Sequence, residues 1–398
     1  MQLLPDVRNS LHPHRLNIAM WCFSWLHCHH PGGSFEDFDK CTDELLERGF
    51  NCIRIECFPW IIGRQKDGEE ITIAANPHAN WGQSPADFKH RVDRELIELL
   101  TICKQKGIFV ILATWGFGCV EYPPALESDN REALDLRHHV WDKTLDLVKD
   151  ANLSDIIAYV DLDQEFPHFS PIKESFKEAS NWVVKESSND PTTAMVEAGL
   201  KVDRDQFSEK QKSILKGYMA EGLEHFQYRY PELRFTYSFT NFVEDIRALG
   251  NLGYDVLELH FWIHGKKFDN RTGFPALPKD RDPQRAYADY QDRVHKTLKS
   301  VGPMLRMERE SKLKFGVSWA EEISVPLVTT EAWGPWWHMD HPDLQWDWLR
   351  DWCEEGMMRA SAYKLWGTTP WNYAHPYWEN WHRDLEWYQR VNQRFLTS

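Results

Sequence analysis

The stretch Ile157-Ala-Tyr-Val-Asp-Leu-Asp-Gln-Glu-Phe-Pro167 begins as an apolar strand and ends in acidic residues and a proline. A second stretch, Val325-Pro-Leu-Val-Thr-Thr-Glu331, has the same form. Short apolar runs of this kind are typical of strands that are buried on both faces. In a barrel of parallel strands the carboxyl ends of all strands open on one face, so Glu165 and Glu331 can meet there although they are far apart in the chain.

The pattern of a short apolar run followed by a longer amphipathic stretch repeats along the whole chain. Such alternation is typical of βα units around a parallel sheet. The predicted strands are residues 16–22, 51–56, 108–113, 156–161, 233–239, 255–260, 325–330 and 361–366. The predicted helices are residues 35–48, 85–105, 138–149, 205–229, 284–308, 346–357 and 376–395. Because eight strands form a closed barrel, the predicted fold class is α/β, a (β/α)8 TIM barrel.

Two of the loops that follow predicted strands carry long insertions, at residues 168–204 and 262–283. Loops in this position build the functional site of a barrel. Glycine marks two of the predicted joints between a helix and the next strand, at Gly49 and Gly107. No linker rich in Pro, Gly or Ser interrupts the chain, so we expect residues 1–398 to form a single domain.

Composition and charge argue against several classes of protein. The formal net charge of -15 disfavours a nucleic-acid partner, because phosphate binding needs a concentrated basic field. No stretch approaches the roughly 18 apolar residues of a membrane span, and the start lacks the apolar run of a signal peptide, so a cytoplasmic protein is expected. The eight cysteines are too sparse for a disulfide scaffold and are expected to be free thiols. The patterns GxGxxG, GxxxxGK[ST], GxSxG and HExxH are absent, and no cofactor is expected.

Charged residues gather at the predicted carboxyl ends of several strands. Because side chains alternate along a strand, Asp161, Asp163 and Glu165 are expected to share one face. Charged groups on a strand that is covered on both faces are costly unless they are paired or near the open end. Their joint placement therefore indicates a site. The other pairs that share a face are Thr329 with Glu331, Arg54 with Glu56, and Glu258 with His260.

Four short motifs carry a resemblance to a known group of enzymes. They are Gly49-Phe-Asn-Cys-Ile-Arg-Ile55, Asp163-Gln-Glu-Phe-Pro167, Leu327-Val-Thr-Thr-Glu331 and Lys364-Leu-Trp-Gly367. In the order and spacing of these motifs the chain resembles the clan of retaining β-glycosidases on (β/α)8 barrels, and within it the cellulase-like, sugar-binding cellulase-like proteins. The resemblance spans most of the chain. It implies a hydrolase of carbohydrate metabolism whose partner is a β-linked oligosaccharide or glycoside.

The resemblance also implies roles for single residues. Glu331 resembles the catalytic nucleophile of the clan, and Glu165 resembles its acid/base. Arg54 matches the cation that keeps the nucleophile ionised, and His260 matches a His or Tyr near it. Trp366 matches the tryptophan that lies under the sugar. The sequence departs from the clan at Gln164, because the clan has an Asn there that bonds the sugar 2-hydroxyl.

A retaining mechanism requires a particular distance and particular protonation states of the two glutamates. Their carboxyl groups must lie about 5 to 5.5 Å apart, one ionised for attack and one protonated to assist the leaving group. Arg54 is expected to lower the pKa of Glu331. Burial and the neighbouring Asp163 are expected to raise the pKa of Glu165. The environment would thus give two like residues different roles.

Tryptophan is abundant, with 20 residues in the chain, many of them in predicted loops after strands. The flat apolar face of an indole suits the C–H face of a sugar ring. Together with the polar candidates, tryptophans therefore complete the predicted substrate-binding set. Its members are Arg54, Trp115, Asp163, Gln164, His260, Trp333 and Trp366.

Two other functions remain open at this point. A divalent-metal sugar isomerase or epimerase would take its ligands from Asp163, Glu165, His260 and Glu331. Arg54 argues against that reading, because a fixed cation repels a metal ion. A barrel that binds carbohydrate without catalysis is compatible with Gln164. The histidines within residues 27–30 and 338–341 are expected to lie in polar loops rather than to hold a metal.

Overall fold

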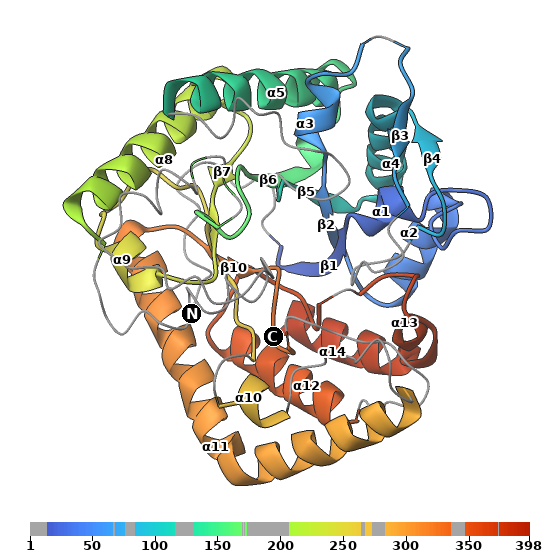
Figure 1. The fold of residues 1–398 in the computed structure, drawn as a ribbon, viewed down its shortest axis with the longest axis vertical. Coiled ribbons are helices and arrows are strands. Elements are labelled where there is room, and N and C mark those ends of the chain that lie inside the picture. Colours follow the sequence, from blue (N-terminus) through green and yellow to red (C-terminus); the bar gives the residue numbers. More distant parts are fainter. Residues whose placement is uncertain are drawn as a thin grey trace.

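A ring of parallel strands lies at the centre of the computed structural model, and helices surround it (Figure 1). The structure describes residues 14–66, 68–75, 84–115, 130–168, 170, 172, 207–263, 267–272, 283–335, 347–372 and 374–398. The strands of the ring are β1 (Leu16–Cys22), β2 (Cys52–Glu56), β5 (Phe109–Ala113), β6 (Ile157–Asp161), β7 (Phe235–Thr236), β8 (Ser238–Phe239), β9 (Leu257–Leu259), β10 (Leu327–Thr329) and β11 (Gly367–Thr368).

The two ends of this sheet meet, which makes it a barrel. Its nine strands follow the order β7-β6-β5-β2-β1-β11-β10-β9-β8, and neighbouring strands pair in parallel. The first and last strands of this order, β7 and β8, are separated only by Tyr237 and together correspond to the predicted strand 233–239. The structure therefore confirms the predicted α/β barrel.

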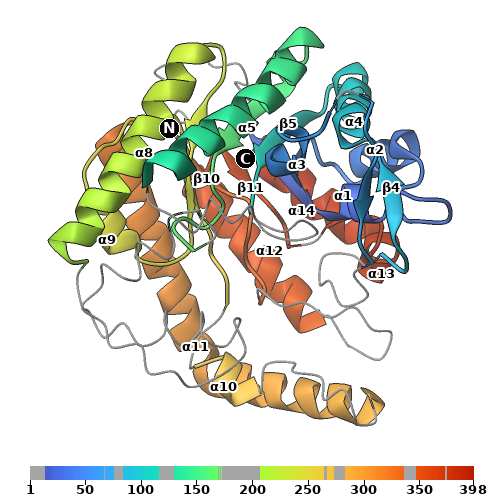
Figure 2. The ribbon, with the colours of Figure 1, turned by 45° about the horizontal axis from the view of Figure 1, so that its top comes forward.

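Helices cover the outside of the ring on all sides (Figure 2). The longer ones are α2 (Phe38–Glu47), α4 (Val92–Lys106), α5 (Asn130–Asp150), α8 (Glu209–Arg229), α11 (Pro283–Ile323), α12 (Asp347–Ala362) and α14 (Leu385–Thr397). The shorter ones are α1 (Ser24–His27), α3 (Pro59–Ile62), α9 (Val243–Arg247), α10 (Asp269–Thr272) and α13 (Glu379–Arg383). None of the helices in the described part of the chain is both long and apolar enough to span a bilayer.

The helix predicted at residues 85–105 begins later than expected. Residues 88–90 instead form β4 (Phe88–His90), which pairs in antiparallel fashion with β3 (Ile71–Ile73) in a small hairpin beside the barrel. The two predicted insertions fall largely on residues 173–206 and 273–282, which lie outside the described residues.

The eighth strand was predicted in the wrong place. Residues 361–366 were expected to form it, but Ser361 and Ala362 end helix α12, and the strand is Gly367–Thr368. An added Cβ on Gly367 would lie 2.9 Å from the Ile18 side chain and 3.2 Å from that of Val328. The close packing of β11 between β1 and β10 thus requires a glycine, and the apolar run before it is a turn.

Local sequence signals explain several element boundaries. Gly49 and Gly107 have φ angles of 78° and 69°, so both predicted joints follow left-handed residues that end a helix. Helix α8 begins with a capping box in which Ser208 and Gln211 bond each other's backbone N–H groups. These signals fix where the helices stop and start around the barrel.

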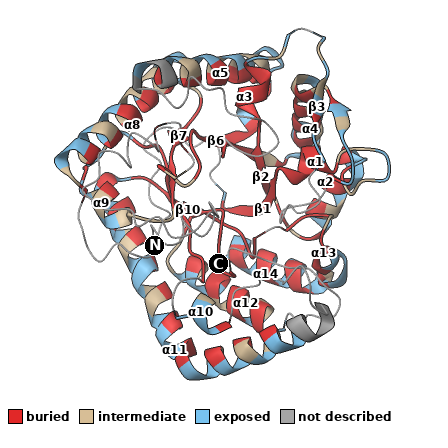
Figure 3. Cartoon of the chain, in the orientation of Figure 1, coloured by how far each residue is buried: buried red, intermediate tan, exposed pale blue. Residues whose placement is uncertain are grey.

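The apolar core has two layers. The larger one lies between strands and helices, which are buried on the faces that meet (Figure 3). The smaller one fills the inside of the barrel with Leu16, Ile18, Cys52, Ile111, Ala158, Tyr159, Val256, Val328 and Trp366. The cysteines among the described residues are buried free thiols. The inner layer supports the polar groups above it.

One buried histidine makes stability depend on pH. His27 is 1% exposed, and neither ring nitrogen has a hydrogen-bond partner in the described part of the structure. Burial, together with the nearby His90, lowers the pKa of His27 to about 4. A histidine in the unfolded chain has a pKa of about 6.5, so the unfolded state binds more protons between these values. Stability is therefore complete above about pH 6.5 and falls as the pH drops toward 4.

We expect His27→Leu to remove this dependence. Between pH 7.5 and 4.5 the wild-type chain should lose about 2 to 3 kcal/mol of unfolding free energy more than the variant does. Urea unfolding followed by tryptophan fluorescence measures the difference. The exposed His295 on α11 provides the control His295→Leu, which should behave as the wild type. Equal pH dependence in wild type and His27→Leu would contradict the assignment.

Candidate active site

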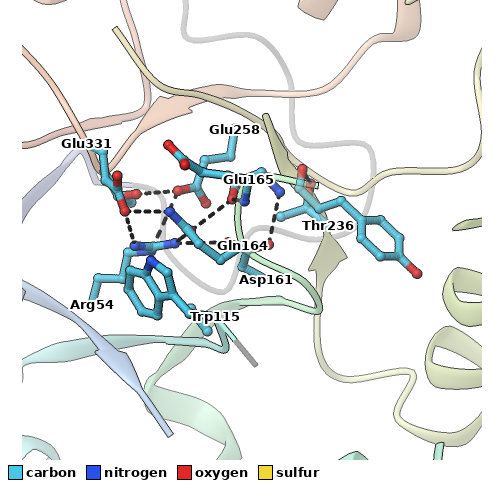
Figure 4. A network of polar contacts seen from close by, with 12 residues as sticks. Arg54, Trp115, Asp161, Gln164, Glu165, Thr236, Glu258 and Glu331 are labelled. Carbon is cyan, nitrogen blue, oxygen red and sulfur yellow. Dashed lines mark hydrogen bonds and ion pairs between the residues drawn. The ribbon is translucent and has the colours of Figure 1, made fainter. Parts of the chain in front are cut away.

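A cluster of charged side chains lies at the carboxyl ends of the barrel strands (Figure 4). Arg54 belongs to β2, Asp161 ends β6, Glu258 belongs to β9 and Glu331 follows β10. All four side chains are buried, directly above the apolar layer inside the barrel. A buried cluster of this kind must satisfy its charges internally.

Arg54 is the centre of this cluster. Its Nη1 donates to Glu331 Oε1 at 2.9 Å, its Nη2 donates to Asp161 Oδ2 at 3.0 Å, and its Nε lies 3.7 Å from Glu258 Oε1. Burial acts to lower the pKa of Arg54, but the charges of Glu258, Glu331 and Asp161 raise it above its ordinary value. Arg54 is therefore a fixed cation beneath Glu331.

Gln164 bonds both Arg54 and Glu331. Its Nε2 donates to Glu331 Oε1 at 2.5 Å, while its Oε1 accepts from Arg54 Nη2 and from Ser238 Oγ, the latter at 3.0 Å. Glu331 Oε1 thus receives two donors, one from Arg54 and one from Gln164. The other oxygen, Oε2, is the one left facing His260, whose Nδ1 lies 3.4 Å away.

Glu165 follows the end of β6 in a left-handed backbone conformation, with φ of 46°. Its backbone N–H donates to Ser238 Oγ at 2.9 Å. Its side-chain Oε1 lies 2.8 Å from His260 Nδ1 and accepts from Trp262 Nε1 at 3.4 Å. The Glu165 side chain is 16% exposed, against 5% for Glu331, so Glu165 is the more exposed of the two glutamates.

The two glutamates and His260 form one group. One carboxylate oxygen of Glu165, one of Glu331 and a ring nitrogen of His260 lie within 4.8 Å of one another. The other ring nitrogen of His260, Nε2, lies 3.4 Å from Glu258 Oε1. Burial acts to lower the pKa of His260, but the charge of Glu331 and the hydrogen bonds to Glu165 and Glu258 raise it to about 10. The imidazole is therefore protonated at neutral pH.

The proton affinities of the two glutamates have the reverse order from the one that the sequence predicted. Burial raises the pKa of Glu331 to about 7, although His260 and Arg54 oppose the shift. Burial also acts to raise the pKa of Glu165, but the hydrogen bond from His260 and the charge of that ring lower it below its ordinary value. Arg54 divides its charge among three carboxylates, whereas Glu165 receives the shortest bond from His260.

Trp115 covers the cation. The Arg54 guanidinium lies 4.4 Å from the centre of the indole ring, in a cation–π contact. The backbone N–H of Trp115 donates to Glu56 Oε2 at 2.6 Å, and Glu56 Oε1 accepts from the Phe58 N–H at 2.8 Å. Burial raises the pKa of Glu56 to about 8 against these donors. Glu56 thus fixes the loop that carries Trp115.

Asp163 does not join the group. Strand β6 ends at Asp161, so the alternation used to place Asp163 beside Glu165 no longer applies. The Asp163 carboxylate instead accepts from Arg137 Nη1 of helix α5 at 3.2 Å. Burial raises the pKa of Asp163 to about 6, and Arg137 limits the rise.

Trp333 and Trp366 also lie away from the group. Trp333 is fully buried, stacks on Phe261 with ring centres 5.7 Å apart, and donates from Nε1 to the Thr369 carbonyl. Trp366 precedes β11, belongs to the apolar layer inside the barrel, and donates from Nε1 to the His14 carbonyl at 3.1 Å. The tryptophan that follows β11 at its carboxyl end is Trp371.

Five residues that contact the site were absent from the predicted set: Glu56, Asp161, Ser238, Glu258 and Trp262. Asp161 and Glu258 bind Arg54, and the alternation along their strands was the signal that could have added them. Ser238, at the start of β8, bonds both Gln164 and the Glu165 backbone, and its N–H donates to Asp161 Oδ1 at 2.9 Å. No sequence pattern distinguishes this serine from others.

Three side chains of this site are of the types that bind metal ions. Among the described residues, Glu165, His260 and Glu331 are the one group of three or more His, Cys, Asp and Glu side chains that could hold an ion. The histidines within residues 27–30 are in no such group, and residues 338–341 lie outside the described part of the chain. Arg54, 2.9 Å from Glu331, would oppose a cation there.

The chain is similar to known proteins in both sequence and fold. Residues 18–396 match the sequence profile of a family described as sugar-binding cellulase-like. A candidate glycoside hydrolase from Parabacteroides distasonis ATCC 8503 is 26% identical, with a TM-score of 0.75 over 97% of this chain and 94% of that one. The endo-β-1,4-mannanase from Thermotoga petrophila is 11% identical, with a TM-score of 0.51 over 96% of this chain and 77% of that one. No curated protein matches the chain significantly.

Proposed function

This chain belongs to the family of sugar-binding cellulase-like proteins, and from that membership we propose that it is a retaining glycoside hydrolase acting on a β-linked oligosaccharide or glycoside. The observation that carries the mechanism is the approach of Glu165 and Glu331, since one carboxylate oxygen of each lies within 4.8 Å of the other. Retaining enzymes hold their carboxyl groups about 5 to 5.5 Å apart, whereas inverting enzymes need about 6.5 to 9.5 Å to admit a water. The short separation supports double displacement.

Glu331 is the proposed nucleophile. Arg54 and Gln164 both donate to its Oε1, which leaves Oε2 as the attacking oxygen. In the first step Glu331 Oε2 forms a bond to the anomeric carbon while the bond from that carbon to the leaving oxygen breaks. The positive charge of Arg54 favours the ionised carboxylate that this attack requires.

Glu165 is the proposed acid/base. Its exposure to solvent suits a group that must give a proton to the leaving oxygen and later take one from water. In the unliganded pair the higher proton affinity belongs to Glu331. Catalysis therefore requires a proton to pass to Glu165 when substrate binds. His260 Nδ1, which lies 2.8 Å from Glu165 and 3.4 Å from Glu331, bridges the two carboxylates.

The proposed substrate contacts follow from the same group. Two tryptophans contact the catalytic group: the indole N–H of Trp262 bonds Glu165, and the ring of Trp115 covers Arg54. Gln164 and His260 are the polar candidates beside the nucleophile. Asp163, Trp333 and Trp366 are not included, because their side chains are bound elsewhere.

The test is a screen of aryl β-glycosides in which proton NMR follows the anomeric resonance of the first product. We expect the β-anomer to appear first and the α-anomer to grow later by mutarotation, since two displacements restore the starting configuration. First appearance of the α-anomer would overturn the retaining mechanism. Absence of product from every glycoside, with a rise in melting temperature on adding sugar, would instead support a barrel that only binds carbohydrate.

The metal-dependent isomerase is the second candidate, because Glu165, His260 and Glu331 could supply three ligands. It is the weaker one, since Arg54 occupies the position next to Glu331 and Asp163 pairs with Arg137 instead. A glycosidase should keep its activity in a chelator and purify without a stoichiometric metal. Loss of activity in the chelator with recovery on adding a divalent ion would favour the isomerase.

A further inference from the structure

We propose that Arg137, on helix α5 outside the barrel, is a positioning residue for the acid/base Glu165; the inference rests on the proposed glycosidase function. Arg137 touches neither glutamate of the pair in the contacts described, and its partners lie on the outer side of the segment that carries Glu165. It would act by fixing the backbone on which Glu165 stands.

The guanidinium of Arg137 lies in a site built for it. It is fully buried, and its Nη1 donates to Asp163 Oδ2 at 3.2 Å and to the Tyr237 hydroxyl at 2.7 Å. Its Nη2 donates to the Tyr218 carbonyl at 3.2 Å. A Cβ added to Gly222 of α8 would lie 2.3 Å from Nη2 and 2.4 Å from the Tyr237 hydroxyl, so the glycine leaves the space that this arginine fills.

The same aromatic side chains hold a second residue of the segment. The Arg137 guanidinium lies 3.8 Å from the centre of the Tyr218 ring and 5.8 Å from that of Tyr237. Phe166 stacks on Tyr218 with ring centres 5.6 Å apart and packs against Tyr237 at 5.1 Å. Asp163 and Phe166 are therefore anchored by one cluster on the outer side of the barrel.

Gln164 and Glu165 lie between these two anchors and turn inward to the catalytic group. Strand β6 has ended by then, and single backbone bonds replace its ladder: the Gln164 N–H donates to the Thr114 carbonyl, the Glu165 N–H to Ser238 Oγ and the Phe166 N–H to the Ser238 carbonyl, each at 2.9 Å. The side-chain anchors at Asp163 and Phe166 add to these bonds and to the contacts of the Glu165 carboxylate with His260 and Trp262 in setting where that carboxylate lies. Without Arg137, Asp163 would be a buried carboxylate without its cation, and the segment would have to move.

The expected effect of Arg137→Met is a defect in proton transfer by Glu165 rather than a general loss of activity. A displacement of about 1 Å from a remote change can cost on the order of 100-fold in rate. We expect kcat/KM for a phenyl β-glycoside, whose leaving group needs a proton, to fall about 10- to 100-fold. We expect kcat/KM for a 2,4-dinitrophenyl β-glycoside, which leaves without protonation, to stay within about threefold of wild type.

The ratio of the two kcat/KM values is the deciding quantity, because it does not depend on how much of the variant is folded. Azide attacks the glycosyl-enzyme without help from a general base. It should therefore restore the kcat of Arg137→Met with the dinitrophenyl substrate, and the product should be the β-glycosyl azide. Asp163→Asn removes the same ion pair with little change of shape and should shift the ratio in the same direction. Arg137→Lys keeps the positive charge, so the ratio of the two kcat/KM values should lie between those of Arg137→Met and the wild type.

Arg131→Met is the matched control, because Arg131 is on the same helix but pairs with Asp135 and Glu221 at the surface. It should leave both substrates unchanged. An equal fall of both kcat/KM values in Arg137→Met, without azide rescue, would overturn the positioning role and leave a structural one. If the wild-type enzyme hydrolyses neither substrate, the proposed function itself fails, and this outcome is distinct from failure of the positioning role.

Discussion

Glu331→Ala will abolish turnover of aryl β-glycosides, with a fall in kcat on the order of 10⁶-fold, the size of the loss when the nucleophile of a covalent mechanism is removed. The expectation follows from the position of Glu331, whose Oε1 is held by two donors while Oε2 remains for attack. Steady-state release of the aryl alcohol measures the effect. Glu331→Gln, which keeps the shape of the side chain, should be equally inactive because an amide does not form the glycosyl ester.

Rescue by an external nucleophile makes this prediction specific. The space left in Glu331→Ala should admit azide, which would displace the leaving group directly and yield the α-glycosyl azide from a β-glycoside. Glu321→Ala, at an exposed position of α11, is the control and should retain full activity. Residual turnover of Glu331→Ala near the wild-type rate would exclude Glu331 as the nucleophile.

Arg54→Met will cost more stability than any other single change at the site. Arg54 lies 3.0 Å from Asp161, 3.7 Å from Glu258 and 2.9 Å from Glu331, all of them buried. Removing one partner of a buried ion pair costs about 3 to 5 kcal/mol, because a charge is left without compensation. The loss should shrink on acidification, since protonated carboxyl groups no longer need the cation. Urea unfolding at pH 7.5 and pH 5 measures both quantities.

Two other arginine changes make the stability test interpretable. Arg247→Met removes a surface pair with Glu322 and should cost at most about 1 kcal/mol. Arg54→Lys keeps the charge but not the planar fork that reaches several acceptors, so it should recover only part of the loss. If Arg54→Met were as stable as Arg247→Met at pH 7.5, the carboxylates would not depend on Arg54.

The sequence predicts the barrel well because its signal is periodic. Apolar runs that are covered on both faces recur between amphipathic stretches, and each predicted strand up to the seventh overlaps an observed one. The eighth strand was misplaced because the two residues that pair, Gly367 and Thr368, carry no apolar signal, while the run before them does. Close packing, which decides this strand, is a property of the neighbours and not of its own residues.

The direction of a side chain can be predicted from the sequence only for residues within or directly beside a regular strand. Arg54 and His260 lie on or beside regular strands, and alternation alone brings them to the centre. Beyond Asp161 the backbone turns, so Asp163 reaches helix α5 instead of the catalytic group. The order of proton affinities could not be predicted either, because it depends on which carboxylate receives the shorter bond from His260.

Three buried acids at the barrel mouth oppose folding as the pH rises toward neutrality. Glu56, Asp161 and Glu331 have pKa values raised to about 8, 7 and 7, so the folded chain holds protons near neutrality that the unfolded chain releases. For a group whose pKa is higher in the folded state, stability falls as the pH rises between its unfolded and folded values. Near neutral pH these groups therefore take up protons from the buffer when the protein folds. The stability that they cost must come from the packing of the outer helices and the inner apolar layer.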